Sequence, residues 1–414
     1  MTSRANLIAR AVIGQFDKLP AKRKPRIREN GLHEWVPLSG IVAERDGSLT
    51  CLALATGMKC LPASKLAEAK GVAIHDWHAE VLAVRAFNRF LLDECRSIME
   101  GGRDDSGAIL QRDDAFDVGE GHARPFRVRD DVKLHMYCSE APCGDASMEL
   151  TMAAQADASP WQLPRPAPSE AEPPALPGRA YFSRLGIVRR KPARGDAPPT
   201  LSKSCSDKIA LKQCTSLLSS LASLLVGPAN AYIDTLVLPE SQHSAAACER
   251  AFSATGRMRP VAGWQWAGGY AFRPFRVEAT GVEFAFSKRA AGARADRISA
   301  SNLAATWSAS GVEETTLGGV LQGRRQFDAG GASKTSRRQM WIAARELSDD
   351  VSASNRAAGG GGFPGLEEHF SSAASYQDVK DGPLLAERRH VKAQVRQLAL
   401  KGWVQNEGDS GFGI

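Results

Sequence analysis

The sequence lacks any apolar run long enough to span a membrane, and no apolar secretory core follows its first residues. These absences argue against a membrane-spanning or secreted protein. The 8 cysteines have no regular spacing, so the sequence gives no sign of a disulfide framework. We therefore expect an intracellular protein with reduced thiols, in the cytoplasm, the nucleus or both, with no membrane partner and no obligate protein partner.

What the chain does have is length and positive charge. Its 414 residues, 43% of them hydrophobic, can bury a substantial core in one large unit or two fused units. The formal net charge is +7, and clustered basic residues ease the approach to a phosphate backbone. The candidates for RNA contact are Lys22, Arg23, Lys24, Arg26, Arg28, Arg189, Arg190, Lys191 and Arg194. The alternative for the first cluster is a solvated face or a nuclear-import signal.

Four residues carry the clearest chemical signal: His78, Glu80 two positions later, and the downstream cysteines Cys143 and Cys205. One imidazole and two thiolates can hold zinc and leave its fourth position open for water. A carboxylate that is not a ligand can then move protons. We therefore predict a zinc site formed by His78, Cys143 and Cys205, with Glu80 as the catalytic acid and base, which is the inventory of a nucleobase deaminase.

The local setting of these residues supports this interpretation. His78 and Glu80 open an apolar-periodic run that predicts a helix through residue 92. Cys143 follows an alternating strand pattern and precedes a short helix near residues 148–152. Cys205 begins a longer helical pattern through Leu225, with Ser206 and Asp207 as its capping candidates. A helix N-terminus favours the thiolate, which is the form that binds metal.

Other segments are biased in composition and predict loop insertions, at about 153–178, 287–301 and 351–365. Between them, residues 232–238 predict a buried strand and residues 384–400 a final helix. Helices alternate with short strands, which indicates an α/β sandwich.

Several motifs together resemble the family of adenosine-to-inosine deaminases that act on RNA. They are Gly40-Ile-Val, Ala55-Thr-Gly-Met-Lys-Cys60, His75-Asp-Trp-His-Ala-Glu80, Pro142-Cys-Gly-Asp145, Gly186-Ile-Val and Ser204-Cys-Ser-Asp-Lys-Ile-Ala210. The segments 142–151 and 185–200 look like the tRNA-specific branch in its fungal form. That branch converts adenosine at position 37 of alanine tRNA to inosine. Cys143 is not followed by a cysteine three residues later, unlike the pattern of cytidine deaminases and wobble-position tRNA deaminases.

The resemblance implies a fold, a domain plan and a second ligand. The fold is α/β: a cytidine-deaminase-like α/β/α sandwich with a central mixed sheet, expanded by C-terminal helices and loop insertions. Residues 1–29 would form a basic N-terminal segment and residues 30–414 a single deaminase domain. Family members also enclose inositol hexakisphosphate in a basic cavity, and the matching positions are Lys59, Arg85, Lys208, Ser220, Arg337, Tyr376, Lys380, Lys392 and Trp403.

Two alternatives remain at this point. A non-catalytic RNA-binding relative would usually have lost a ligand or the glutamate, and all four residues are present here. A deaminase acting on another structured RNA would share the whole zinc pattern. The sequence therefore predicts zinc-dependent deamination of adenosine in RNA, with tRNA as the substrate that the resemblance implies.

Overall fold

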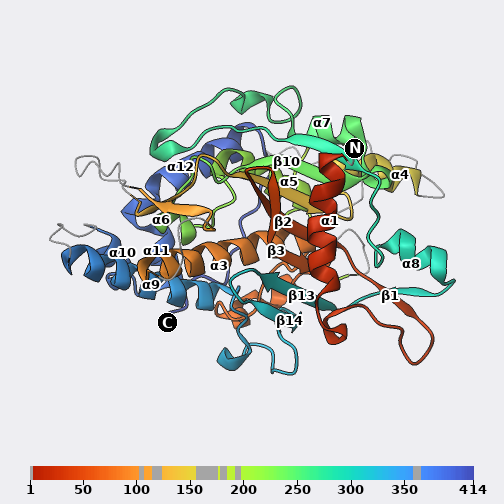
Figure 1. Ribbon diagram of the computed structural model, residues 1–414, viewed down its shortest axis with the longest axis horizontal. Coiled ribbons are helices and arrows are strands. Elements are labelled where there is room, and N and C mark those ends of the chain that lie inside the picture. The colour runs from red at the N-terminus through yellow and green to blue at the C-terminus, as the bar shows by residue number, and fades with distance from the viewer. Residues whose placement is uncertain are drawn as a thin grey trace, which may run out of the picture.

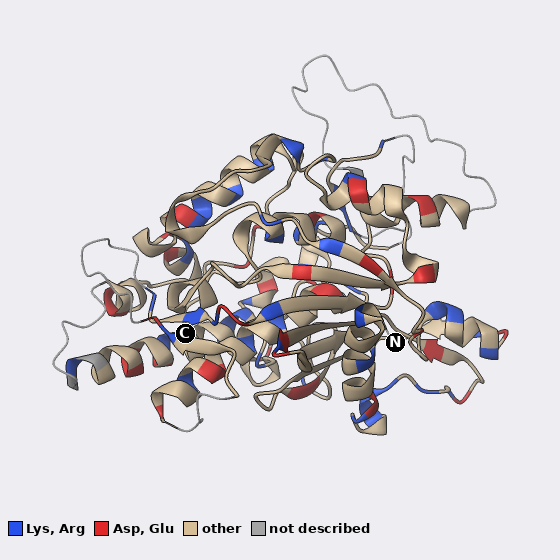
Figure 2. Cartoon of the chain, turned by 45° about the horizontal axis from the view of Figure 1, so that its top comes forward, with Lys and Arg blue, Asp and Glu red and all other residues tan. Residues whose placement is uncertain are grey.

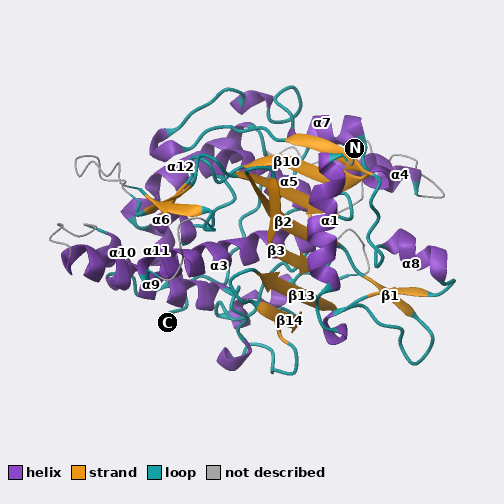
Figure 3. Cartoon of the chain, in the orientation of Figure 1, coloured by secondary structure: helices purple, strands orange, loops and turns teal. Residues whose placement is uncertain are grey.

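The computed structural model describes residues 3–101, 107–113, 124–154, 176–177, 184–191, 197–357 and 365–414. Helices and strands alternate along this part of the chain (Figures 1 and 3). The helices are α1 (Arg4–Asp17), α2 (Leu66–Ala69), α3 (Ala79–Met99), α4 (Met148–Ala153), α5 (Cys205–Thr215), α6 (Ala222–Leu225), α7 (Ala245–Phe252), α8 (Lys288–Arg294), α9 (Arg337–Ala357), α10 (Leu366–Ser371), α11 (Tyr376–Asp381) and α12 (Ala386–Leu398). The strands are β1 (His33–Trp35), β2 (Leu38–Arg45), β3 (Ser48–Thr56), β4 (Leu110–Arg112), β5 (Phe126–Val128), β6 (Lys133–Cys138), β7 (Leu176–Pro177), β8 (Arg189–Arg190), β9 (Val226–Gly227), β10 (Ile233–Pro239), β11 (Arg276–Thr280), β12 (Ile298–Ala300), β13 (Leu303–Ser308), β14 (Glu313–Leu317) and β15 (Val320–Leu321).

The core of the fold is an 8-stranded sheet in the order β11-β10-β6-β2-β3-β13-β14-β15. The strands β11, β10 and β6 pair in parallel, whereas the pairs from β6 to β15 are antiparallel. Mixed pairing of this kind with helices on the faces is an α/β architecture. The predicted α/β fold with a central mixed sheet is thus confirmed.

Helices cover the sheet on both faces. On β2, Ile41 packs in one apolar cluster with Phe87 of α3, while Val42 packs in another with Ile8 and Val12 of α1. Alternate side chains of a strand point to opposite faces, so α3 and α1 lie on opposite sides of the sheet. In Figure 1, α1 crosses in front of the central strands. The segment expected to lie outside the domain therefore contributes a core helix.

Two of the predicted loop insertions contain regular structure instead. Residues 287–301 include α8 and β12, and β12 pairs with β1. The side chain of Ser287 caps α8 by accepting a hydrogen bond from the backbone N–H of Ala290. Alanine and arginine are strong helix formers, which explains why this composition folds. Residues 351–357 continue α9, and most of the segment 153–178 lies outside the described residues.

The helical pattern predicted from Cys205 to Leu225 is interrupted. Helix α5 ends at Thr215 because Ser216 has a φ of 58°, which no continuing helix allows. The cap of α5 is Ser204, whose side chain accepts a hydrogen bond from the backbone N–H of Asp207, rather than Ser206 or Asp207. Cys205 is therefore the first residue of the helix.

The C-terminal segment returns to the core beside α3. The Asp409 carboxylate is fully buried and accepts a hydrogen bond from the backbone N–H of Gly71 at 2.7 Å. Its other oxygen lies 2.5 Å from Nε2 of His75, three residues before His78. Residues near the end of the chain thereby fix the turn that leads into α3. Within the described ranges, no helix has the length and apolar character that crossing a bilayer requires.

We expect Ile8→Ala to lower the free energy of unfolding by about 2–5 kcal/mol, because Ile8 is fully buried between α1 and the sheet. Urea denaturation followed by circular dichroism measures this change. The control is Leu7→Ala, since Leu7 is 46% exposed and its truncation should cost about 0.5 kcal/mol. Equal effects of the two substitutions would show that α1 does not pack on the sheet in solution.

Candidate metal and RNA site

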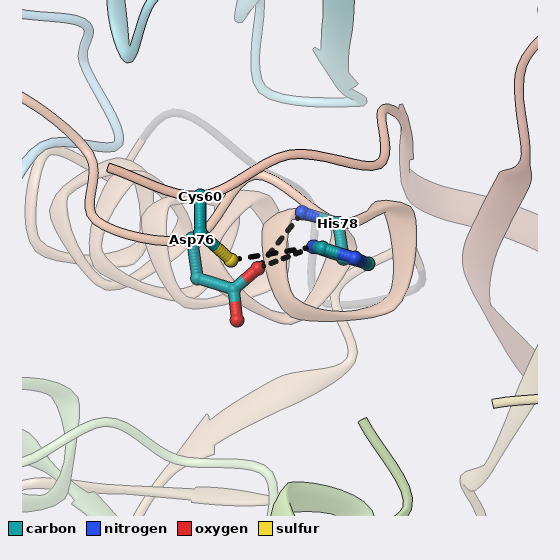
Figure 4. Close-up of side chains that lie close together, drawn as sticks. All are labelled: Cys60, Asp76 and His78. Carbon is teal, nitrogen blue, oxygen red and sulfur yellow. Dashed lines mark hydrogen bonds and ion pairs between the residues drawn. The ribbon is translucent and has the colours of Figure 1, made fainter. Parts of the chain in front are cut away.

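The turn before α3 presents His78 and Glu80. His78 is the N-cap residue of α3, and Glu80 lies in its first turn with only 6% of its surface exposed. Asp76 accepts a hydrogen bond from the backbone N–H of His78 at 3.0 Å and lies 2.8 Å from its Nδ1 (Figure 4). A carboxylate on Nδ1 fixes the imidazole orientation and leaves Nε2 as the atom to bind a ligand. The same interaction orients metal-binding histidines in general.

Cys60, Asp76 and His78 form a group of potential metal ligands, with their donor atoms within 4.8 Å of one another. The Cys60 Sγ lies 3.7 Å from Nδ1 of His78, as Figure 4 shows. Asp76, however, also contacts two ammonium groups, with Lys191 Nζ at 2.9 Å and Lys208 Nζ closer still. A carboxylate that is already neutralised by two cations suits the support of His78 better than the direct binding of a metal.

Cys143 and Cys205 lie on two turns that pack against each other. The backbone N–H of Cys205 points at Cys143 Sγ over 3.3 Å. The Ser206 hydroxyl donates to the Pro142 carbonyl at 2.9 Å, and the backbone N–H of Ser206 donates to the Cys143 carbonyl at 3.0 Å. Gly144 has a φ of +102°, and a Cβ there would lie 2.3 Å from the Ser204 hydroxyl. Only glycine allows this approach, which brings the two cysteines together.

Lys191 links the cysteine turns to the histidine turn. It is 5% exposed, and its Nζ lies 3.2 Å from Cys205 Sγ and 2.9 Å from Asp76. Lys208, one turn into α5, contacts the same carboxylate. The cation of Lys191 therefore lies between a predicted metal ligand and the carboxylate that orients another.

The surroundings shift the pKa values of Glu80, Cys143 and Cys205 differently. Burial and the neighbouring Cys143 raise the pKa of Glu80. The hydrogen bond with Cys205, together with the charges of Lys191 and His78, holds the pKa of Cys143 well below its usual range despite burial. Burial and Cys143 raise the pKa of Cys205 well above its usual range. A divalent cation between the two sulfur atoms would favour the thiolate at both.

The predicted RNA-contact residues fall into different environments. Lys22 and Arg26 are exposed, whereas Arg23 pairs with Glu313 at 3.0 Å and Arg28 with Glu34 at 2.8 Å. Lys24 donates to the Asp17 carbonyl at 2.7 Å. Arg189 and Lys191 are buried, which argues against a direct contact of their side chains with RNA. Arg190 is half-buried, and Arg194 lies outside the described residues.

A cavity of about 290 Å³ lies behind Glu80, lined by α3, α5, α9 and α12. Seven of the nine residues predicted for the inositol phosphate line it: Arg85, Lys208, Ser220, Arg337, Tyr376, Lys392 and Trp403. Lys59 does not, because it is exposed and bonds Asn302. Lys380 also stands outside the lining, with its Nζ 5.9 Å from the centre of the Tyr376 ring.

Three cations in the cavity wall were not predicted: Lys212, Arg388 and Arg396. Their spacing was a usable signal. Arg388, Lys392 and Arg396 repeat every four residues along α12, and Lys212 follows Lys208 by four in α5. Basic residues at this spacing share one helix face. A basic helix face of this kind can bind a buried anion as readily as it can form a solvated surface.

Comparison with known proteins places the chain in a family. A family model for the adenosine-deaminase (editase) domain matches residues 53–407. The chain is 41% identical over 287 residues to tRNA-specific adenosine deaminase 1 of Schizosaccharomyces pombe, covering 68% of this chain and 70% of the relative. It is 36% identical to tRNA-specific adenosine deaminase 1 of Saccharomyces cerevisiae, covering 52% and 53%. A shorter match, 31% over 97 residues, covers 23% of this chain and 12% of double-stranded RNA-specific editase B2 of the rat. On this evidence, the chain belongs to the adenosine-deaminase (editase) family.

Proposed function

We propose that this protein converts adenosine to inosine in tRNA by zinc-dependent hydrolysis, with position 37 of alanine tRNA as its target. The observation that carries the proposal is a chain of contacts in a member of the editase family. Asp76 orients His78, Lys191 joins Asp76 to Cys205, and the backbone N–H of Cys205 points at Cys143 Sγ. Glu80, two residues after His78, is buried. The relatives from Schizosaccharomyces pombe and Saccharomyces cerevisiae are named tRNA-specific adenosine deaminases, which favours tRNA over other RNA.

In this proposal His78, Cys143 and Cys205 hold the metal. One ring nitrogen and two sulfur atoms are a donor set that zinc prefers, and three protein ligands leave a position open. The group of Cys60, Asp76 and His78 shares the histidine, and Asp76 supports it from behind. Zinc bound there would act as a Lewis acid that makes water a nucleophile near neutral pH.

Glu80 moves the protons. Its carboxylate accepts a proton from the attacking water and delivers it to N1 of the purine. It then accepts the proton of the new C6 hydroxyl and delivers it to the departing amino group. The oxygen of water adds to C6 of the purine. The bond between C6 and the amino nitrogen then breaks, which releases ammonia and yields inosine. Burial raises the pKa of Glu80, so the group holds a proton more readily than a carboxyl in water.

The target base must leave its stack to reach a buried glutamate, because C6 of a stacked adenine is not accessible. Lys22 and Arg26 are exposed cations that can contact the tRNA backbone. Arg190 is half-buried, and its backbone pairs with Lys203, two residues before Cys205. Basic and acidic positions are interspersed over most of the helices and strands (Figure 2). We therefore expect the protein to bind the tRNA backbone through a few exposed cations.

The cavity behind Glu80 is proposed to hold inositol hexakisphosphate. Its lining includes seven cationic side chains and one acidic one, Glu80. Arg85, Lys212 and Arg388 donate to backbone carbonyl groups rather than to carboxylates. Burial and the surrounding cations, Arg388 foremost, hold the pKa of Lys392 well below its usual range. A polyanion would neutralise these charges, which cannot otherwise be buried together cheaply.

We expect Glu80→Gln to lower the rate of inosine formation by about 10²–10⁴-fold or more. The zinc content of the protein should stay unchanged. The amide keeps the shape of the side chain but cannot accept the proton. Inosine mapping and atomic absorption on the same preparation measure the two quantities. Glu68→Gln, an exposed position, is the control and should retain full activity. Normal activity in Glu80→Gln would remove Glu80 from the mechanism.

Incubation with alanine tRNA and with an unrelated RNA duplex tests the substrate. We expect inosine at position 37 of the tRNA and none in the duplex. Inosine in the duplex alone would contradict tRNA as the substrate and leave the deamination chemistry standing.

Mass spectrometry of acid-released small molecules tests the cavity ligand. We expect inositol hexakisphosphate at about one molecule per chain and clearly less in Lys392→Met, because Lys392 lines the cavity. Lys59→Met should keep the normal amount, since Lys59 lies at the surface. The absence of any inositol phosphate from the purified wild-type protein would refute this ligand.

A further inference from the structure

Each cysteine of the proposed metal site is followed two residues later by a buried aspartate. The pairs are Cys143 with Asp145 and Cys205 with Asp207, and both carboxylates are fully buried. A buried carboxylate must be paired or hydrogen-bonded to remain charged. The contacts of these two aspartates therefore show what fixes the cysteine turns.

Asp145 is held from two sides. Its Oδ1 accepts a hydrogen bond from the backbone N–H of Gly186 at 2.8 Å and from Nε of Arg250 at 3.1 Å. Arg250, on α7, also donates from Nη2 to the Asp145 backbone carbonyl at 2.9 Å. The remainder of its guanidinium binds both oxygens of Glu149 on α4. Arg250 therefore binds both the turn that carries Cys143 and the helix that follows this turn.

Asp207 is held in the same manner. Its Oδ2 accepts from the Ser204 hydroxyl at 2.6 Å and from the backbone N–H of Arg189 at 2.9 Å. Its Oδ1 accepts from Nη1 of Arg257 at 2.6 Å, and the side chain of Arg257 is only 3% exposed. Each aspartate therefore receives one backbone N–H from the 184–191 loop and one arginine from the region of α7.

The two arginines are joined by hydrogen bonds at the end of α7. The backbone N–H of Arg257 donates to the backbone carbonyl of Arg250 at 2.9 Å, and Nε of Arg257 donates to the Ala251 carbonyl at 2.9 Å. The turn after α7 is thereby closed on the helix itself. The two cysteine turns are therefore held by arginines from one hydrogen-bonded turn.

We propose that Arg250 and Arg257 are positioning residues that set the separation of the two metal-binding sulfur atoms. Metal affinity depends on ligand placement to within about 0.5 Å, and residues behind the ligands supply that accuracy. Neither arginine contacts a sulfur atom in the bonds described above; each acts through the aspartate two residues after a cysteine. The inference rests on the proposed zinc site, and it assigns to the α7 region a role in holding the metal.

The test compares zinc release from wild-type protein, Arg250→Lys and Arg250→Gln in the presence of a chromogenic chelator. We expect both variants to release zinc about 10–100-fold faster, because lysine keeps the charge but cannot bind Asp145 and Glu149 together. The cobalt-substituted proteins should also differ in their visible absorption, which reports ligand geometry. Arg276→Gln is the control, since it breaks a largely exposed ion pair with Asp234.

The outcomes separate the two proposals. Wild-type protein without zinc would refute the proposed metal site itself. The positioning role would be overturned by a different result, in which the wild-type protein contains zinc and the folded Arg250→Lys variant behaves like it. The variant would then release zinc at the wild-type rate and show an unchanged cobalt spectrum. Should Arg250→Gln fail to fold, Arg250→Lys carries the test alone. Thermal unfolding of each variant excludes general destabilisation as the cause of faster release.

Discussion

The carboxylate of Asp76 is the point on which the site depends. It binds the backbone and ring of His78, the ammonium groups of Lys191 and Lys208, and the Ser202 hydroxyl at 2.5 Å. The positive charges hold the pKa of Asp76 well below its usual range despite burial. Three separate segments of the chain are thereby joined at one anion. Loss of that charge would leave buried cations unpaired and the imidazole without its orienting partner.

The same network connects two regions that would otherwise be independent. Lys208 contacts Asp76 and also lines the basic cavity, so the charge in that cavity acts on the histidine turn through one side chain. On the opposite side, the 184–191 loop brings both Lys191 and the N–H groups that hold the two aspartates. The geometry of the site therefore depends on Lys208 and on the 184–191 loop, which contact the residues that support the proposed ligands.

The sequence predicted the parts of the site that depend on local signals. His78 and Cys205 lie at helix N-termini that apolar periodicity indicates, although the cap predicted for the second helix was not the residue that caps it. The strand before Cys143 follows from its alternation. Burial of charge was not predictable in this way. Lys191 and Arg189 lie in a stretch that looks solvated, yet both are buried. Lys191 pairs with the carboxylate of Asp76, far away in the sequence, and Arg189 donates to the backbone carbonyl of Arg184. Such pairings depend on the tertiary fold and leave no periodic pattern.

The position of β2 in the sheet bears on what counts as the folding unit. The family match begins at residue 53, within β3, yet β2 lies between β3 and β6 at the centre of the sheet. A polypeptide cut to the matched region would lose this strand and α1, which leaves two unpaired strand edges and an uncovered apolar face. Such edges recruit strands from other molecules, so the shortened chain would aggregate. In this chain, α1 and β2 therefore belong to the folded unit although both precede the matched region.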